Sequence, residues 1–301
     1  MWGPSGHSKL GIREQDANTR PMPRPFVTAG LLVVGIALVG LVLIAIVLVL
    51  KQDRLLFFPT RGLASGPEAF GLRAEALSIR TEDGLSLHGW WIKGNGRKAL
   101  LYFHGNAGNA ADRLARAGIL NERIGLDIFL VDYRGYGRSE GSPSEDGLYR
   151  DGRAIYQEAI RSGFGAERII LFGESLGSAV AIRLATERKC AALILETPFL
   201  SVPALARVHY PFVPSFLVSN RFDNASRIGS VAVPILLILA ELDEVAPASQ
   251  GHELFELAPG RKTLEVITAA HHNDTSAVGG ETYWQAWERF LAVLPEPTSP
   301  R

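Results

Sequence analysis

Cysteine is nearly absent from this 301-residue chain, which contains only Cys190. A single cysteine excludes an intramolecular disulfide, and its place before the apolar run 191–195 predicts a buried, unreactive thiol. Net charge is absent as well, because 31 Lys and Arg residues balance 31 Asp and Glu residues. Proteins that bind nucleic acid usually carry a basic excess or a basic stripe, so the composition predicts no nucleic-acid partner.

Motifs for metals and nucleotides are also missing. The sequence contains no His-Glu-x-x-His pattern or comparable ligand cluster, so we expect neither a metal nor a cofactor. The glycine-rich stretch 104–109 matches neither G-x-G-x-x-G nor a phosphate-binding loop with its lysine, which argues against a nucleotide site. No internal repeat or low-complexity block interrupts residues 75–295.

One long hydrophobic run is present. Residues 27–50 carry no charge and consist mostly of Val, Leu, Ile, Ala and Gly. As a helix this run extends about 36 Å, more than a hydrocarbon core of about 30 Å requires. It is longer than the apolar part of a cleaved signal peptide, and it is not amphipathic like a helix of a soluble protein. We therefore predict a transmembrane helix over 27–50, after a disordered polar tail over 1–26.

Basic residues flank the hydrophobic run on both sides, four between positions 9 and 24 and three between positions 51 and 61. The positive-inside rule slightly favours a cytoplasmic N-terminus and a large C-terminal domain on the non-cytoplasmic side. Residues 51–74 are expected to form a juxtamembrane linker. The apolar stretch 55–59 within it either lies at the membrane interface or packs onto the domain, and the sequence favours neither.

From residue 75 to 295, short apolar strands alternate with helical stretches. Eight strands are predicted, over 76–80, 85–92, 98–103, 127–131, 168–172, 192–195, 234–239 and 263–266. Helices are predicted over 110–123, 144–162, 176–188, 248–257 and 281–293. The first two strands form an antiparallel pair around the turn 83–84. The later alternation predicts an α/β fold, a mostly parallel sheet with helices on both faces.

The strongest chemical signal is the sequence Gly173-Glu174-Ser175-Leu176-Gly177. It follows an apolar strand and opens a helix, which is the context of a nucleophile elbow. Glycine permits the sharp turn that lifts the serine hydroxyl above the sheet. We therefore predict Ser175 as a nucleophile and the Leu176 N–H as one donor of an oxyanion hole.

A serine nucleophile needs a histidine base that is oriented by a carboxylate. His271 and His272 lie in the loop just past the last predicted strand, and spacing alone leaves both open as the base. His209 lies in an irregular, proline-flanked stretch, and His252 falls inside a predicted helix. These two positions are less suited to a catalytic histidine.

Three acidic residues compete for the role of the orienting carboxylate. Asp243 follows the predicted strand 234–239 and is our candidate. Glu196 also ends a strand and is interpreted as a structural carboxylate near the pocket. Asp223 resembles a turn or cap residue.

The loop 104–109, His-Gly-Asn-Ala-Gly-Asn, follows the strand 98–103. Its small residues let the backbone approach a substrate closely. The loop after this strand supplies the second oxyanion N–H in enzymes with a nucleophile elbow, so we predict the Asn106 N–H as that donor. His104 is upstream of the serine and is interpreted as a structural histidine.

These motifs together resemble the α/β-hydrolase-domain serine hydrolases with one N-terminal membrane anchor, the Bem-type family, whose eukaryotic relatives include protein depalmitoylases. The matching blocks are Leu56–Arg61, His104–Asn109, Asp132–Gly141, Gly173–Ser178, Glu196–Phe199, Leu242–Glu244 and His272–Thr275. The resemblance implies the α/β-hydrolase fold over 75–295. It also favours His272 over His271, because the family's histidine directly precedes Asn-Asp. The chain departs from the family at Ala270, where a glycine near the histidine is more common, and at Ala246, where valine is common.

The resemblance implies hydrolysis of acyl esters or thioesters, with lipid-like or S-acyl substrates, through Ser175, Asp243 and His272. A serine peptidase of the aminopeptidase-like type and a non-catalytic membrane scaffold remain alternatives. Residues 198–234 leave room only for a short cap, whose aromatic residues hold an acyl chain, touch a bilayer or pack into the core. The loop 132–141 is expected to be structural, with Arg134 bracing the site.

Overall fold

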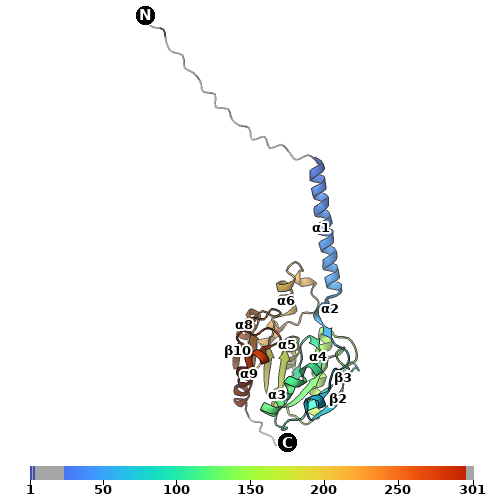
Figure 1. Cartoon of the computed structure of the whole chain (residues 1–301), viewed down its shortest axis with the longest axis vertical. Helices are drawn as coiled ribbons and strands as arrows, with labels where there is room; N and C mark the ends of the chain where they lie inside the picture. The colour runs from blue at the N-terminus through green and yellow to red at the C-terminus, as the bar shows by residue number, and fades with distance from the viewer. Residues whose placement is uncertain (2, 4–23, 296–301) are drawn as a thin grey trace. The chain divides into compact units, whose positions relative to one another are not determined.

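The computed structural model describes residues 24–295 together with Met1 and Gly3 (Figure 1). Its contacts divide the chain into two units, Met1–Val47 and Leu48–Arg301. The predicted polar tail over 1–26 lies almost entirely outside the described residues.

A single long helix, α1 (Arg24–Leu50), contains the hydrophobic run. It begins three residues before the predicted start, because a proline such as Pro25 is tolerated in the first turn of a helix. Among the described residues, one stretch, Thr28–Val47, is long and apolar enough to cross a membrane, with a mean hydropathy of 3.1.

The second unit is built on an eight-stranded sheet in the order β10-β9-β8-β7-β4-β6-β3-β2. The strands are β2 (Ala74–Arg80), β3 (Ser86–Ile92), β4 (Ala99–Phe103), β6 (Asp127–Val131), β7 (Ile169–Glu174), β8 (Ala192–Glu196), β9 (Ile235–Ala240) and β10 (Lys262–Ile267). All neighbours pair in parallel except β3, which is antiparallel to both β2 and β6. The predicted mostly parallel α/β sheet is confirmed.

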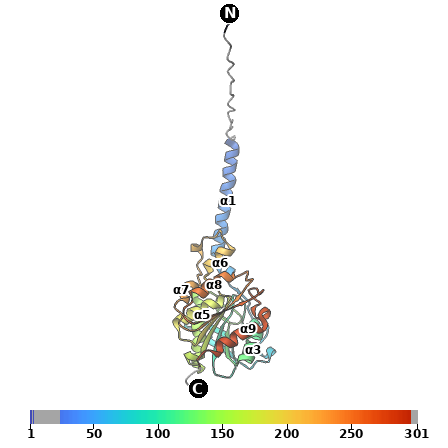
Figure 2. The same cartoon turned by 90° about the vertical axis from the view of Figure 1, so that its left-hand side faces the viewer.

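Helices cover both faces of this sheet (Figure 2). One face carries α3 (Leu114–Ile124) and α9 (Thr275–Ala292), and the other carries α4 (Glu145–Arg161), α5 (Leu176–Glu187), α7 (Asn224–Ile228) and α8 (Ala248–Leu257). Short 3₁₀ turns are η1 (Pro67–Phe70), η2 (Ala110–Arg113), η3 (Ala166–Arg168) and η4 (Ser215–Leu217). Along β4, Leu101 and Phe103 join the α4–α5 core while Leu100 and Tyr102 join the α3–α9 core, as the two-residue period of a strand requires.

Two helix starts differ from the predicted boundaries. α9 begins at Thr275, six residues earlier than predicted, because it consists of two helical pieces joined at a kink. Gly280 at the kink has φ 47° and ψ −125°, which is not helical. The helical periodicity after this glycine was recognisable in the sequence, whereas the short piece before it was not. η2 occupies the first turn of the predicted helix 110–123.

The segment predicted as a linker over 51–74 is structured. It contains α2 (Gln52–Leu56) and β1 (Phe58–Pro59), and β1 pairs in parallel with β5 (Ala107–Gly108). Phe57 between them is 4% exposed and packs edge-to-face on Phe222. Part of the apolar stretch 55–59 therefore packs onto the domain, because a buried aromatic side chain contributes more there than it would in water.

The chain between β8 and β9 forms a short cap. It consists of α6 (Val202–His209), η4 and α7. Two of its aromatic residues, Phe199 and Phe222, are buried in the core, whereas Phe212 and Phe216 are exposed. Core packing thus explains only part of the aromatic content of the cap.

Candidate active site

Ser175 lies at the tight turn between β7 and α5, as the elbow motif predicts. Its φ is 49° and its ψ is −114°, a backbone conformation that residues other than glycine rarely adopt. A Cβ atom on Gly177 would lie 2.0 Å from the carbonyl oxygen of Phe103, and one on Gly173 would lie 2.5 Å from that of Gly177. Both glycines are therefore required for α5 to approach β4 and β7 closely.

Three side chains from separate strand ends form one hydrogen-bonded chain. His272 Nε2 lies 2.8 Å from Ser175 Oγ, and His272 Nδ1 lies 2.8 and 2.7 Å from the two carboxylate oxygens of Asp243. The carboxylate accepts from Nδ1–H, which leaves Nε2 to accept the serine hydroxyl proton. The backbone N–H groups of Val245 and Ala246 donate to Asp243 Oδ1 at 2.9 and 2.7 Å and hold the carboxylate in place.

The neighbouring histidine does not join this chain. His271 has a side chain 56% exposed and its Nδ1 lies 3.1 Å from Glu244 Oε2, whereas the His272 side chain is 5% exposed. His209 Nε2 instead contacts the carbonyl oxygen of Val245 at 2.8 Å, and His252 is exposed on α8. Of the downstream histidines, His272 is the one that lies against Ser175.

Two backbone N–H groups next to the serine are available as donors. Leu176 is the first residue of α5, and Asn106 lies in the loop after β4, which is aligned with β7 at Phe103 and Gly173. Within the described part of the chain, neither the Leu176 nor the Asn106 N–H has an acceptor. The oxyanion hole at these two N–H groups stays a prediction.

The Asn106 backbone is fixed by groups on three sides. Its carbonyl oxygen accepts from the Phe58 N–H at 2.9 Å and from the Tyr136 hydroxyl at 2.8 Å. Its side-chain amide donates to the Leu56 carbonyl at 2.8 Å. These contacts hold the peptide in one orientation without using its N–H.

The loop 132–141 braces the site through tyrosines and not through Arg134, which corrects the prediction. The Tyr133 hydroxyl donates to the His104 carbonyl at 3.1 Å, beside the contact of Tyr136 with the same loop. Arg134 forms ion pairs with Asp83 at 2.8 Å and Asp151 at 2.9 Å. Arg134 therefore links the β2–β3 turn to α4.

His104 is completely buried beneath this loop, and burial lowers the pKa of its imidazole to about 3. Its Nδ1 lies 2.8 Å from the Gly105 carbonyl oxygen, so Nδ1 carries the proton and the ring is neutral. Its Nε2 lies 3.7 Å from Asp132 Oδ1, and burial raises the pKa of that carboxyl to about 7. The interpretation of His104 as structural is confirmed.

A buried polar network behind the elbow was missed by the sequence analysis. Glu174, next to Ser175, accepts from Arg113 at 3.0 Å and from the Tyr102 hydroxyl at 2.7 Å. Burial alone would raise the pKa of Glu174. The positive charges of Arg113 and Arg116 outweigh this effect and lower the pKa to about 2. The position of Glu174 inside the elbow motif was the only sequence feature that pointed to this network. The contacts of Arg113 and Arg116 with Glu174 are visible only in the folded structure.

The same network extends through Glu196 to the segment that follows His272. Glu196 is hydrogen-bonded to Arg116, to Tyr283 and to Thr275, which begins α9 three residues after His272. Its backbone carbonyl accepts from the Ser175 N–H at 2.9 Å. Glu196 thus joins the elbow to the segment that follows His272, in agreement with its interpretation as a structural carboxylate.

Relatives of known sequence match most of the chain. An uncharacterized protein of Mycobacterium tuberculosis is 37% identical over 247 residues, which cover 80% of this chain and 87% of that protein. Protein bem46 of Schizosaccharomyces pombe is 32% identical over 238 residues, covering 75% and 79%. An uncharacterized membrane protein of Saccharomyces cerevisiae is 32% identical over 234 residues, covering 75% and 82%. A family model described as serine aminopeptidase, S33, matches residues 94–228.

The chain belongs to the α/β-hydrolase family that contains these relatives. Among solved structures, an esterase from Pyrococcus furiosus superimposes with a TM-score of 0.65 at 23% identity, covering 79% of this chain and 97% of the esterase. That similarity supports the α/β-hydrolase fold. The family model ends before Asp243 and His272, so their assignment depends on the geometry described above. Among the described residues, no group of three His, Cys, Asp or Glu side chains is arranged to hold a metal ion.

Proposed function

We propose that this α/β hydrolase is a membrane-anchored serine hydrolase that cleaves acyl esters or thioesters through an acyl-enzyme on Ser175. The observation that carries the proposal is the hydrogen-bonded chain from Asp243 through His272 to Ser175. Its two links are both between 2.7 and 2.8 Å, the distance at which a proton can pass from a hydroxyl to a base.

In the proposed mechanism, His272 Nε2 takes the proton of Ser175 Oγ as Oγ attacks the acyl carbonyl carbon. The N–H groups of Leu176 and Asn106 donate to the resulting oxyanion. His272 then gives its proton to the departing alcohol or thiol, and the acyl group stays on Oγ. A water molecule, activated by His272, attacks the acyl-enzyme and releases the carboxylic acid. Asp243 stabilises the imidazolium that forms in both halves.

Ester or thioester cleavage fits the surroundings better than aminopeptidase activity. An aminopeptidase needs an acidic group to bind the substrate's free amine. An apolar cavity lies beside Asn106, and the described residues that line it include no Asp and no Glu. A non-catalytic scaffold is opposed by the strain at Ser175, since a strained backbone conformation of this kind persists at sites where it has a function.

Membrane anchoring by α1 is part of the proposal. The stretch Thr28–Val47 has the required length, and a relative from S. cerevisiae is named a membrane protein. The flanking charges further lead us to propose that the hydrolase domain faces the non-cytoplasmic side. Protease protection of the domain in sealed vesicles prepared from the producing cells tests that orientation directly.

Labelling with a fluorophosphonate tests the chemistry, because the probe reacts with an activated serine. We expect the full chain to be labelled, and Ser175→Ala and His272→Ala to abolish labelling. His271→Ala is the matched control, since it changes an adjacent histidine that does not contact the serine. Loss of labelling in His271→Ala with retention in His272→Ala would reassign the base. A folded wild-type chain that is never labelled would refute the proposal.

A further inference from the structure

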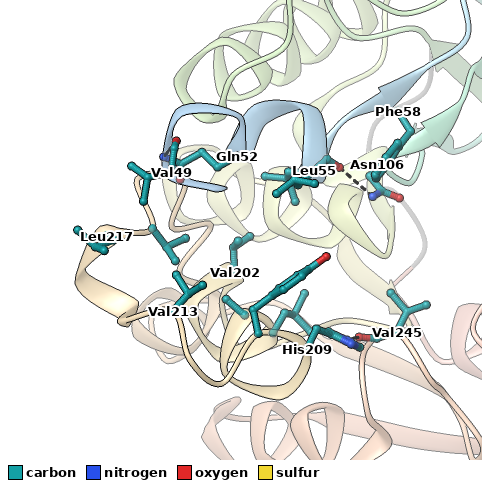
Figure 3. A pocket seen from close by; sticks show the side chains of 15 residues that line it. Val49, Gln52, Leu55, Phe58, Asn106, Val202, His209, Val213, Leu217 and Val245 are labelled. Carbon is teal, nitrogen blue, oxygen red and sulfur yellow. Dashed lines mark hydrogen bonds between the residues drawn. The ribbon is translucent and has the colours of Figure 1, made fainter. Parts of the chain in front are cut away.

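An apolar cavity of about 330 Å³ lies in the second unit, beside Asn106 (Figure 3). Cavities of about 300–1,000 Å³ are typical of small-molecule sites. Eleven of its fifteen lining residues are Val, Leu, Ala or Phe, and the polar exceptions are Gln52, Asn106, His209 and Tyr210. Polar ligand groups would go unpaired against most of this surface, so the lining favours a hydrocarbon occupant.

Two residues that line the cavity connect it to the proposed catalytic groups. Asn106 supplies the proposed oxyanion donor, and Val245 donates its N–H to Asp243. A hydrocarbon chain in the cavity would therefore continue from an acyl carbonyl at Ser175. The cap forms a second part of the lining, mainly through α6 and η4.

The remaining wall comes from the segment directly after the candidate membrane span. This juxtamembrane wall is residues 49–58, of which Val49, Gln52, Leu55, Leu56 and Phe58 line the cavity. Val49 follows the end of the span at Val47 by two residues along the chain. The chain that emerges from the proposed anchor is thus itself part of the cavity.

Hydrogen bonds fix the juxtamembrane wall to both other sides of the cavity. Gln52 Oε1 accepts from the Ser219 N–H at 2.8 Å, and Asp53 Oδ1 accepts from Asn220 Nδ2 at 2.6 Å. The Leu56 carbonyl accepts from the Asn106 side chain, as the dashed line in Figure 3 shows. The wall is therefore a positioned part of the hydrolase unit and not a loose tether.

We infer that the juxtamembrane wall is a specificity-determining part of an acyl-chain site, and that the substrate is a membrane-borne amphiphile whose hydrocarbon chain fills this cavity. The inference rests on the proposed function, since it places the ester or thioester carbonyl at Ser175. It adds that the segment directly after the anchor, residues 49–58, is itself part of the acyl-chain site.

Photocrosslinking from Ser175 tests this placement. The probe is an alkyl fluorophosphonate with a diazirine near the end of its alkyl chain, reacted with the full-length chain in phosphatidylcholine vesicles. We expect probe bound to Ser175 to crosslink, after illumination, to peptides that contain residues 49–58 and 202–218. Crosslinks confined to other peptides or to lipid would overturn the inference while leaving the hydrolase proposal intact. Absence of any Ser175 adduct would refute the proposed function, and the inference falls with it.

A chain-length series supplies a second, kinetic test with p-nitrophenyl esters from acetyl to dodecanoyl. Each buried methylene contributes about 0.8 kcal/mol, so kcat/KM should rise about fourfold per methylene until the cavity is full. Leu205→Trp fills the cavity and should lower the ratio of dodecanoyl to acetyl kcat/KM on the order of tenfold, the equivalent of roughly two methylenes. Leu55→Trp should do the same from the juxtamembrane wall.

Val208→Trp is the matched control, because Val208 lies on α6 near Leu205 but is half exposed and does not line the cavity. We expect its ratio to equal that of wild type. A wild type that hydrolyses acetyl esters with no chain-length dependence would overturn the inference alone. An equal loss in Val208→Trp and Leu205→Trp would also overturn it, because the effect would then come from disturbance of α6.

Discussion

The elbow region and the juxtamembrane wall belong to the same proposed site, and they are held in different ways. The elbow, residues 173–178, is fixed by strained backbone, two obligatory glycines and buried charges. The wall, residues 49–58, is fixed by a few hydrogen bonds and by the buried ring of Phe57, while its apolar residues Leu55 and Phe58 remain about half exposed.

This difference separates two tasks within one site. Bond cleavage requires atoms placed within tenths of an ångström, which buried, densely hydrogen-bonded backbone can provide. Accommodation of a hydrocarbon chain requires only apolar area of suitable shape. We therefore expect substitutions near the elbow to abolish activity or stability, and substitutions in the wall to change which substrate is preferred.

The largest expected effect is that of Asp243→Asn on kcat. The amide oxygen is expected to accept from the Val245 and Ala246 N–H groups, so the amide NH2 faces His272 Nδ1 as a donor. His272 then takes the wrong tautomer, and kcat should fall about 10⁴-fold. The matched control is Glu244→Gln, one residue further on, whose exposed carboxylate contacts the side chain of His271 and only the backbone of His272. We expect its kcat for an acyl ester to stay within about twofold of wild type, as for a surface substitution.

Comparable losses in the two variants would contradict the assignment of Asp243. They would show that the whole loop, and not one carboxylate, controls the base. Ester hydrolysis at saturating substrate distinguishes the two cases, because it reports kcat without the binding contribution of the cavity.

Most of the fold could be predicted from the sequence. The strands of the sheet are buried on both faces and therefore appear as continuous apolar runs, such as Ala99–Phe103. Short elements were less accessible: β1 has two residues, and its pairing with β5 depends on contacts almost fifty residues away. The linker over 51–74 looked irregular because its order comes from those distant contacts.

The residues of the candidate site were also predictable only where a local sequence pattern marks them. Ser175 is announced by a local motif whose glycines are sterically required, and Asp243 and His272 each follow a strand. Spacing could not separate His271 from His272, because both lie in one loop and only the direction of each side chain distinguishes them. Arg116 and Tyr283 were not predicted, since nothing in the sequence near either residue indicates that both contact Glu196.

The second prediction concerns this buried network. Arg116→Met removes the cationic partner of Glu196, whose carboxylate is 3% exposed. An unpaired buried charge typically costs about 3–5 kcal/mol, so the melting temperature should fall sharply. A substitution in the cap, Phe216→Ser, should change stability by no more than about 0.5 kcal/mol, because Phe216 is 80% exposed. Thermal unfolding of the full chain in detergent compares the two.

The double variant Arg116→Met with Glu196→Gln shows whether charge is the cause. Removing both charges leaves no uncompensated ion, so much of the lost stability should return. A double variant that unfolds as easily as Arg116→Met would show instead that packing of the arginine stem stabilises the region. Arg123→Met controls for charge on α3, since the ion pairs of Arg123 with Glu281 and Glu288 are at the surface, although its guanidinium also lies over the Trp284 ring.

The smallest expected effect per pH unit is a change in the pH dependence of stability from the buried pair Asp132 and His104. Burial raises the pKa of Asp132 from 3.8 to about 7, so the folded chain binds one proton more than the unfolded chain between these values. That group makes stability fall as pH rises through this window, by at most about 1.4 kcal/mol per pH unit. Asp132→Asn has no such proton and still offers an oxygen to the Ala110 N–H.

His104 acts in the opposite direction. Burial lowers its pKa from 6.5 to about 3, so the unfolded chain binds the extra proton and stability rises with pH in this range. The two effects largely cancel in wild type, and Asp132→Asn exposes the contribution of His104. The stability of Asp132→Asn relative to wild type should therefore increase between about pH 4 and pH 7, measured by denaturant unfolding at each pH. A constant difference would mean that the pKa of Asp132 is the same in the folded and unfolded chains, so that its carboxylate is ionised in the folded chain across this range.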